Sequence, residues 1–128
     1  MPDPARAGAL IYAKDLERLS AFYQALLGMK PLARDAQHHV LESGDMQLVI
    51  HAIPEHIART FSIATPPELR EEQAIKLFFT VQDLPGAEGV AAKLGGGVFG
   101  PAYPGPGFVA RNAFDPEGNI FHLRAFGS

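Results

Sequence analysis

The sequence predicts an α+β protein made of two β-α-β-β-β modules, and three observations support this class. An apolar strand, an aspartate and an amphipathic helix follow one another twice, around Asp15 and Asp83, which are 68 residues apart (83 − 15). Each half also ends in a predicted strand with a histidine, and His51 and His122 are 71 residues apart (122 − 51). The turn over residues 115–119 precedes the last strand, because its proline presets φ and its glycine accepts a positive φ. Such self-similarity predicts duplicated modules whose open sheet faces need each other, with the two histidines in equivalent positions.

Composition limits the classes of function. The 128 residues are 47% hydrophobic and 20% charged, which predicts one globular domain over residues 1–128. The net charge of −3 and the lack of a basic run argue against a nucleic-acid partner. The absence of cysteine excludes disulfides, thiolate nucleophiles and zinc–cysteine sites. No stretch resembles a leader or a membrane span, so we expect a cytoplasmic protein without a membrane partner.

The first module is predicted to span residues 7–59. Asp15 is a suitable N-cap, the apolar side chains after it recur at helical spacing, and Gly28 stands where a C-terminal glycine belongs. The proline in the second strand favours a sheet edge. The predicted elements are, in order, strand 8–13, helix 16–27, strand 29–34, hairpin strands 38–42 and 46–53, and a helical turn over 55–59.

A connector over residues 60–73 leads to the second module, residues 74–128. In its first strand, alternation places Ile75, Leu77 and Phe79 towards the helix and Lys76 on the opposite face. The glycine- and proline-rich segment 100–107 is predicted to be either a lid or an inert connector. The predicted elements are strand 74–81, helix 84–94, and strands 98–99, 108–114 and 119–126.

Two sequence signatures resemble one known superfamily. The order and spacing are similar to those of the glyoxalase/bleomycin-resistance/extradiol-dioxygenase (vicinal oxygen chelate) proteins over essentially the whole chain. The resemblance implies a curved eight-stranded cup with helices outside, a small-molecule ligand inside, and a homodimer. The signatures are Leu10-Ile11-Tyr12-Ala13 with Asp15-Leu16, Phe22-Tyr23 and Leu27-Gly28-Met29, and Asp115-Pro116-Glu117-Gly118-Asn119 with His122-Leu123.

The resemblance also implies where a metal ion would bind. In metal-using members the ligands come from the first and last strands of each half, which correspond to Gly8, His51, Lys76 and His122. Glycine has no donor and lysine is a cation, so only His51 and His122 could hold a divalent metal ion, where catalytic sites commonly use about three protein ligands. Glu42 or a second chain could complete the set.

Four basic residues are predicted to line the pocket. His51, Lys76, His122 and Arg124 would together attract an anion, and arginine suits bidentate contact with a carboxylate or phosphate. Satisfied interior histidines and solvated strand ends are the alternative interpretations.

Aromatic residues complete the predicted site. Tyr12 and Phe108 would form an apolar wall, and Tyr103 would contribute from the lid. Phe78 is predicted to be core. The remaining histidines, His38, His39 and His56, are predicted to be surface or turn residues outside the site.

Two functions follow from these observations. One is a metal-free binding protein that holds an anionic or oxygen-rich small molecule, and the gaps at Gly8 and Lys76 favour it. The other is a metal-dependent glyoxalase-like lyase or dioxygenase that uses His51 and His122. No catalytic residue is assigned.

Overall fold

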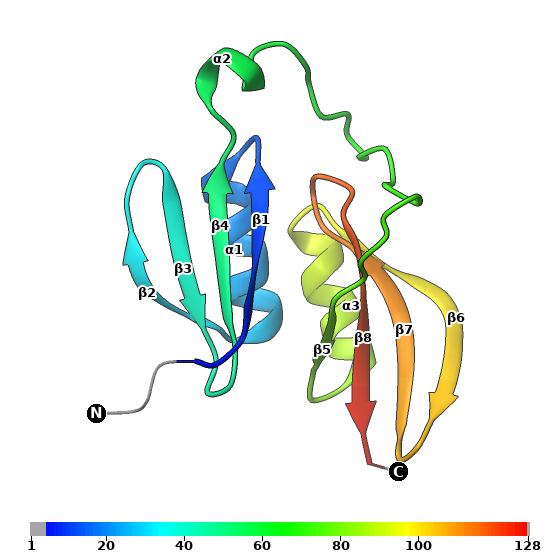
Figure 1. Ribbon diagram of the computed structural model, residues 1–128. Helices are drawn as coiled ribbons and strands as arrows, with labels where there is room; N and C mark the ends of the chain where they lie inside the picture. Colours follow the sequence, from blue (N-terminus) through cyan, green and yellow to red (C-terminus); the bar gives the residue numbers. More distant parts are fainter. Residues whose placement is uncertain (1–4, 128) are drawn as a thin grey trace. The chain divides into compact units, whose positions relative to one another are not determined.

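The computed structural model describes residues 5–127, and within them eight strands and three helices follow the order β-α-β-β-β-α-β-α-β-β-β (Figure 1). The chain divides into two compact units between Ser62 and Ile63, inside the predicted connector. Each unit contains one four-stranded sheet and one long helix, so the predicted α+β class with two β-α-β-β-β modules is confirmed. No helix in the described part of the chain is long and apolar enough to span a membrane.

The first module has the strand order β1-β4-β3-β2. Strand β1 is parallel to β4, and the other neighbouring strands are antiparallel. Strand β2 contains Pro31 and lies at the sheet edge, as predicted, because a proline has no N–H to donate to a second neighbour. The elements are β1 (Gly8–Ala13), α1 (Leu16–Leu27), β2 (Lys30–Arg34), β3 (His38–Glu42), β4 (Gln47–Ala52) and the short helix α2 (Glu55–Ala58).

Helix α1 begins and ends where the sequence predicts. The Asp15 side chain accepts a hydrogen bond from the Arg18 N–H at 3.1 Å, and Gly28 adopts φ 65°, which suits glycine. Its apolar stripe packs against β3 and β4. The core of this module therefore lies between α1 and one face of the sheet, and its largest members are Leu19, Phe22, Tyr23, Leu41, Leu48 and Ile50.

His39 is buried in this core, so its prediction as a surface residue is wrong. Only 2% of it is exposed, and its Nδ1 lies 2.6 Å from Ser20 Oγ on α1. Its Nε2 lies 3.3 Å from the carboxylate of Glu17 on the same helix. The period-two alternation of β3 explains the burial, because His39 and Leu41 share the face that α1 covers.

The second module has the strand order β5-β8-β7-β6. Strand β5 is parallel to β8, and the other neighbouring strands are antiparallel. Asp83 caps the helix by accepting from the Gly86 N–H at 2.6 Å, as Asp15 does in the first module. The elements are β5 (Phe78–Thr80), α3 (Leu84–Lys93), β6 (Gly97–Gly105), β7 (Phe108–Phe114) and β8 (Ile120–Phe126).

Two predictions about the strands of this module are wrong. Residues 100–105 are neither a lid nor a connector, because β6 runs through them and Tyr103 pairs with Ala110. The prolines are tolerated since β6 is an edge strand and its register shifts between Val98 and Ala102. Strand β5 is also shorter than predicted, and Ile75 is 75% exposed rather than facing the helix.

The turn at residues 115–119 is held by the side chain of its first residue. Asp115 Oδ1 accepts from the Glu117 N–H at 2.9 Å and the Asn119 N–H at 3.1 Å, and its Oδ2 accepts from Asn119 Nδ2 at 2.8 Å. Gly118 has φ 89°, and a Cβ there would lie 2.0 Å from the backbone oxygen of Glu68. The segment before β5 therefore packs directly on this turn and requires glycine.

We expect Gly118→Ala to destabilise the protein by at least about 2 kcal/mol, because it combines a disfavoured φ with a backbone clash. Urea unfolding followed by circular dichroism measures the change. The matched control is Gly89→Ala in the exposed middle of α3, where an added Cβ meets nothing and alanine should stabilise by up to about 1 kcal/mol. Equal effects of the two substitutions would contradict this account of the turn.

We expect Ser20→Ala to lower the free energy of unfolding by about 1–3 kcal/mol, because it removes the hydroxyl partner of the buried His39 ring. The exposed Ser62 provides the control, since Ser62→Ala should change stability by less than about 0.5 kcal/mol. Thermal and urea unfolding of both variants measure the difference. An unchanged Ser20→Ala variant would show that this hydrogen bond does not stabilise the module.

Candidate functional site

The sheet of the second module has two chemically different faces. Phe79, Phe121 and Leu123 are buried on the face that packs against α3. Strand alternation then places His122 and Arg124 on the opposite face, as the sequence predicts. The register adds their neighbours on this face, because His122 stands between Phe78 and Asn112 and Arg124 stands between Thr80 and Ala110.

Arg124 contacts two aromatic rings from the strands on either side of it. Its guanidinium carbon lies 3.8 Å from the ring centroid of Phe78 on β5 and 4.2 Å from that of Phe108 on β7. A guanidinium over a phenyl ring is attracted by the quadrupole of the ring and is restrained in its plane. Phe78 is 52% exposed, so its prediction as core is wrong. We call Phe78, Phe108, His122 and Arg124 the Arg124 cluster.

Gly105 explains how the ring of Phe108 reaches this position. Gly105 and Phe108 are cross-strand neighbours at the end of the β6–β7 hairpin. A Cβ on Gly105 would lie 2.2 Å from the Phe108 ring, so the ring occupies the space that any other residue would fill. The missing side chain thus helps to position one of the two rings at Arg124.

The contact between Arg124 and His122 fixes the protonation of the imidazole. Arg124 Nη2 lies 3.1 Å from His122 Nε2, and a guanidinium can only donate, so Nε2 accepts and the proton of the neutral ring is on Nδ1. Burial lowers the pKa of His122, and the positive charges of Arg124 and Lys76 lower it further. The ring is therefore neutral at physiological pH.

One donor of the cluster has no acceptor. Arg124 Nε is buried, and no hydrogen-bond partner lies within reach among the described residues. An unsatisfied buried N–H costs about 1–3 kcal/mol, which makes such groups uncommon outside functional sites.

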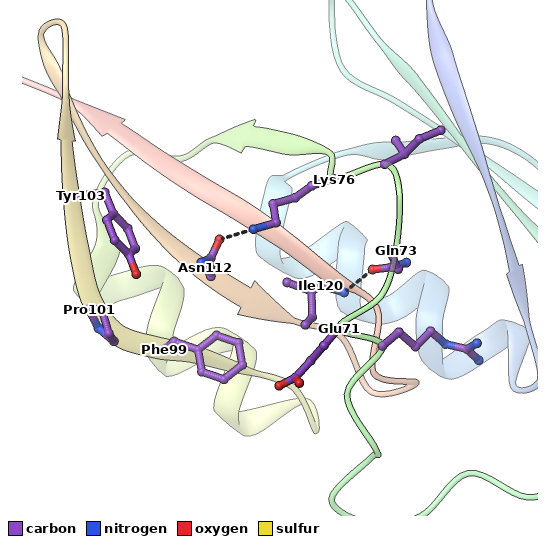
Figure 2. A pocket seen from close by; sticks show the side chains of 10 residues that line it. Glu71, Gln73, Lys76, Phe99, Pro101, Tyr103, Asn112 and Ile120 are labelled. Atoms are coloured by element: carbon purple, nitrogen blue, oxygen red, sulfur yellow. Dashed lines mark hydrogen bonds between the residues drawn. The ribbon is translucent and has the colours of Figure 1, made fainter.

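A pocket of about 290 Å³ lies within the same module. Figure 2 shows Tyr103 on β6, Asn112 on β7, and Lys76 reaching Asn112, whose Oδ1 accepts from Lys76 Nζ at 3.2 Å. Glu71 lies beside Phe99 and is the acidic member of the lining. Since Asn112 is the cross-strand neighbour of His122, the pocket adjoins the Arg124 cluster.

The first module carries its own row of ring side chains on the face opposite α1. Tyr12, His51 and His38 are neighbours across β1, β4 and β3. The ring centroid of His51 lies 5.4 Å from that of Tyr12 and 5.9 Å from that of His38. The His51 Nδ1 lies 2.8 Å from the backbone oxygen of Ala52, so Nδ1 donates and Nε2 keeps its lone pair. The prediction placed His38 outside the site, but the alternation of β3 already sets it on the face opposite His39.

The register corrects one correspondence between the modules. Tyr12 and Thr80 each stand three residues before the helix cap, and they pair with His51 and Arg124 respectively. His51 therefore corresponds to Arg124, so the prediction that His51 and His122 occupy equivalent positions is wrong. The two spacings of 68 and 71 residues concealed this shift.

The structure assigns the predicted site residues to two groups. Lys76, Tyr103, Phe108, His122 and Arg124 belong to the second module, and Tyr12 and His51 belong to the first. Within the second module, Phe108, His122 and Arg124 meet, while Lys76 and Tyr103 line the adjoining pocket. The common pocket predicted for both groups stays a prediction.

The surroundings of His122 do not fit a metal ion. Its Nε2 lone pair accepts from Arg124, and Lys76 and Arg124 add positive charge that would repel a cation. Gly8 offers no side-chain donor. Residues 5–127 contain no group of three or more His, Cys, Asp or Glu side chains arranged to hold a metal.

Comparison with known proteins supplies the family. A model of the glyoxalase-like domain matches residues 9–124. An enzyme of the glyoxalase/bleomycin resistance protein/dioxygenase family from Burkholderia phytofirmans PsJN is 20% identical, with 97% of this chain and 100% of that chain covered and a TM-score of 0.69. The bleomycin resistance determinant encoded on transposon Tn5 is 20% identical, with 98% and 100% covered and a TM-score of 0.62.

A third similar structure is a mutant of the fosfomycin resistance protein FosX from Listeria monocytogenes, in complex with Mn(II) and a dihydroxypropylphosphonic acid. It is 15% identical, with 94% of this chain and 88% of that chain covered and a TM-score of 0.66. No curated protein sequence matches the chain. The family match over residues 9–124, together with the fold, shows that this chain belongs to the glyoxalase-like domain family of the vicinal oxygen chelate superfamily.

Proposed function

We propose that the protein binds a small anionic, oxygen-rich molecule at the Arg124 cluster and the adjoining pocket. The observation that carries this proposal is the guanidinium of Arg124, which lies against two phenyl rings and has a buried Nε–H without an acceptor. A carboxylate, phosphate or phosphonate oxygen would satisfy such a donor.

The surroundings of Arg124 favour an anion over a neutral ligand. The two phenyl rings hold the guanidinium in place and exclude water from part of it, which strengthens a charge-assisted hydrogen bond. His122 occupies one Nη2 donor, and a guanidinium has five N–H groups, so donors remain for a ligand. The neutral His122 ring can also donate from Nδ1.

The pocket suggests the rest of the ligand. Lys76 provides a second positive charge, Asn112 provides an amide, and Tyr103 provides a hydroxyl beside the apolar ring of Phe99. We infer a molecule with an anionic head group at Arg124 and further oxygen atoms towards Lys76 and Asn112. The phosphonic acid in the FosX complex is an anion of this chemical class.

The metal-dependent lyase or dioxygenase is the less supported alternative, because His122 lacks the surroundings of a ligand to a metal ion. The homodimer and the cytoplasmic location stay predictions. Gel filtration with light scattering and cell fractionation would test them.

We expect Arg124→Gln to weaken binding of methylphosphonate, inorganic phosphate or acetate by about 10–100-fold, because a hydrogen bond to a charged group contributes about 1.5–3 kcal/mol. Thermal shift identifies the anion that binds, and calorimetry measures its Kd. Arg18→Gln, on the exposed part of α1, is the matched control and should bind like the unchanged protein. No shift with any of these anions, or equal affinity of Arg124→Gln, would contradict the proposal.

We expect the pKa of His122 to lie below its ordinary value in the free protein and to rise when an anion binds, because the anion offsets the charges of Arg124 and Lys76. Because the folded state binds this proton less readily, His122 should also reduce stability as pH falls below the ordinary histidine pKa. Imidazole titration by NMR with and without phosphate measures both values. A pKa at or above the ordinary value in the free protein, or one lowered by the anion, would contradict this account.

A further inference from the structure

We propose that His38 and His51 form a two-imidazole site for a divalent transition-metal ion on the face of the first module opposite α1. The two residues are direct cross-strand neighbours on β3 and β4. Their ring centroids are 5.9 Å apart and their planes differ by 15°, so the rings lie side by side above the sheet. This pair is distinct from the predicted pair of His51 and His122, and it does not depend on the proposed anion site.

Both imidazoles present the same nitrogen to a ligand. His38 Nδ1 lies 3.1 Å from the carboxylate Oδ1 of Asp35, and His51 Nδ1 lies 2.8 Å from the backbone oxygen of Ala52. Because each Nδ1 faces an oxygen acceptor, the neutral rings carry their proton there and keep a lone pair on Nε2. Over residues 5–127, neither Nε2 has a hydrogen-bond partner.

The partners of the two Nδ1 atoms are those of metal-binding histidines. Ligating imidazoles commonly donate their second N–H to a carboxylate or a backbone carbonyl, which fixes the ring and raises its basicity. Asp35 is itself fixed, because its Oδ1 accepts from the backbone N–H groups of Gln37 at 2.8 Å and His38 at 2.9 Å. The Asp35–His38 pair is thus a carboxylate–histidine unit held by its own turn.

The chemistry of the pair selects the class of ion. Two neutral imidazoles suit Cu²⁺, Ni²⁺ and Zn²⁺, and the usual affinity order places Cu²⁺ first among them. His38 has a side chain that is 44% exposed, so an ion can reach the pair from solvent. Two protein ligands leave coordination positions for water or for an oxygen of a small molecule.

Titration of the untagged, chelator-treated protein with Cu²⁺ tests the site by calorimetry and electron paramagnetic resonance. We expect one ion per chain, with a spectrum that shows two nitrogen ligands and with Ni²⁺ and Zn²⁺ binding more weakly. His38→Ala and His51→Ala should each weaken binding by at least about tenfold. Asp35→Asn should weaken it by about tenfold, since loss of an outer-shell partner commonly costs 10–100-fold.

The other histidines provide matched controls. His56→Ala on α2 and His122→Ala in the second module should leave Cu²⁺ affinity unchanged. Full affinity in both His38→Gln and His51→Gln would overturn the proposal, as would an equal loss in His122→Ala. Circular dichroism and thermal unfolding confirm that each variant is folded, and the glutamine variants retain a polar side chain on this face if an alanine variant unfolds.

Discussion

One-sided burial determines where the functional side chains of this protein lie. Each four-stranded sheet packs one face against a single helix, and strand alternation then divides neighbouring residues between two environments. On β3, His39 is buried against α1 while His38 is on the opposite face. On β8, Leu123 is buried while His122 and Arg124 are on the opposite face. A shift of one residue in either strand would exchange these roles.

The same constraint creates the unusual environment of Arg124. Because Arg124 is on the central strand β8, both neighbouring strands contribute a ring, Phe78 from β5 and Phe108 from β7. The rings and His122 engage the guanidinium but leave its buried Nε–H without an acceptor in the described chain. The protein therefore carries a cost of about 1–3 kcal/mol that an anionic ligand would remove. A binding function explains why such a cost is retained.

Local signals in the sequence predicted most of the fold. The caps at Asp15 and Asp83, the glycine after α1 and the 115–119 turn are fixed by chemistry within a few residues, and all were predicted. Strand β6 was missed because prolines oppose a strand unless it lies at an edge, and edge position depends on the order of all four strands.

The candidate site was predicted only in part, because it depends on contacts between strands. Alternation correctly placed His122 and Arg124 on one face, but it could not show that Phe78 and Phe108 contact Arg124. Burial of His39 depends on Ser20, which is 19 residues away in the chain. The correspondence of His51 to Arg124 became visible only through the strand register.

The most direct test of the account is the NMR signal of the Arg124 Nε–H during titration with methylphosphonate or phosphate. The account predicts that this signal, assigned by its loss in Arg124→Gln, moves downfield and exchanges more slowly with water as the anion binds. An anion that binds while this signal stays unchanged would contradict the central role of Arg124.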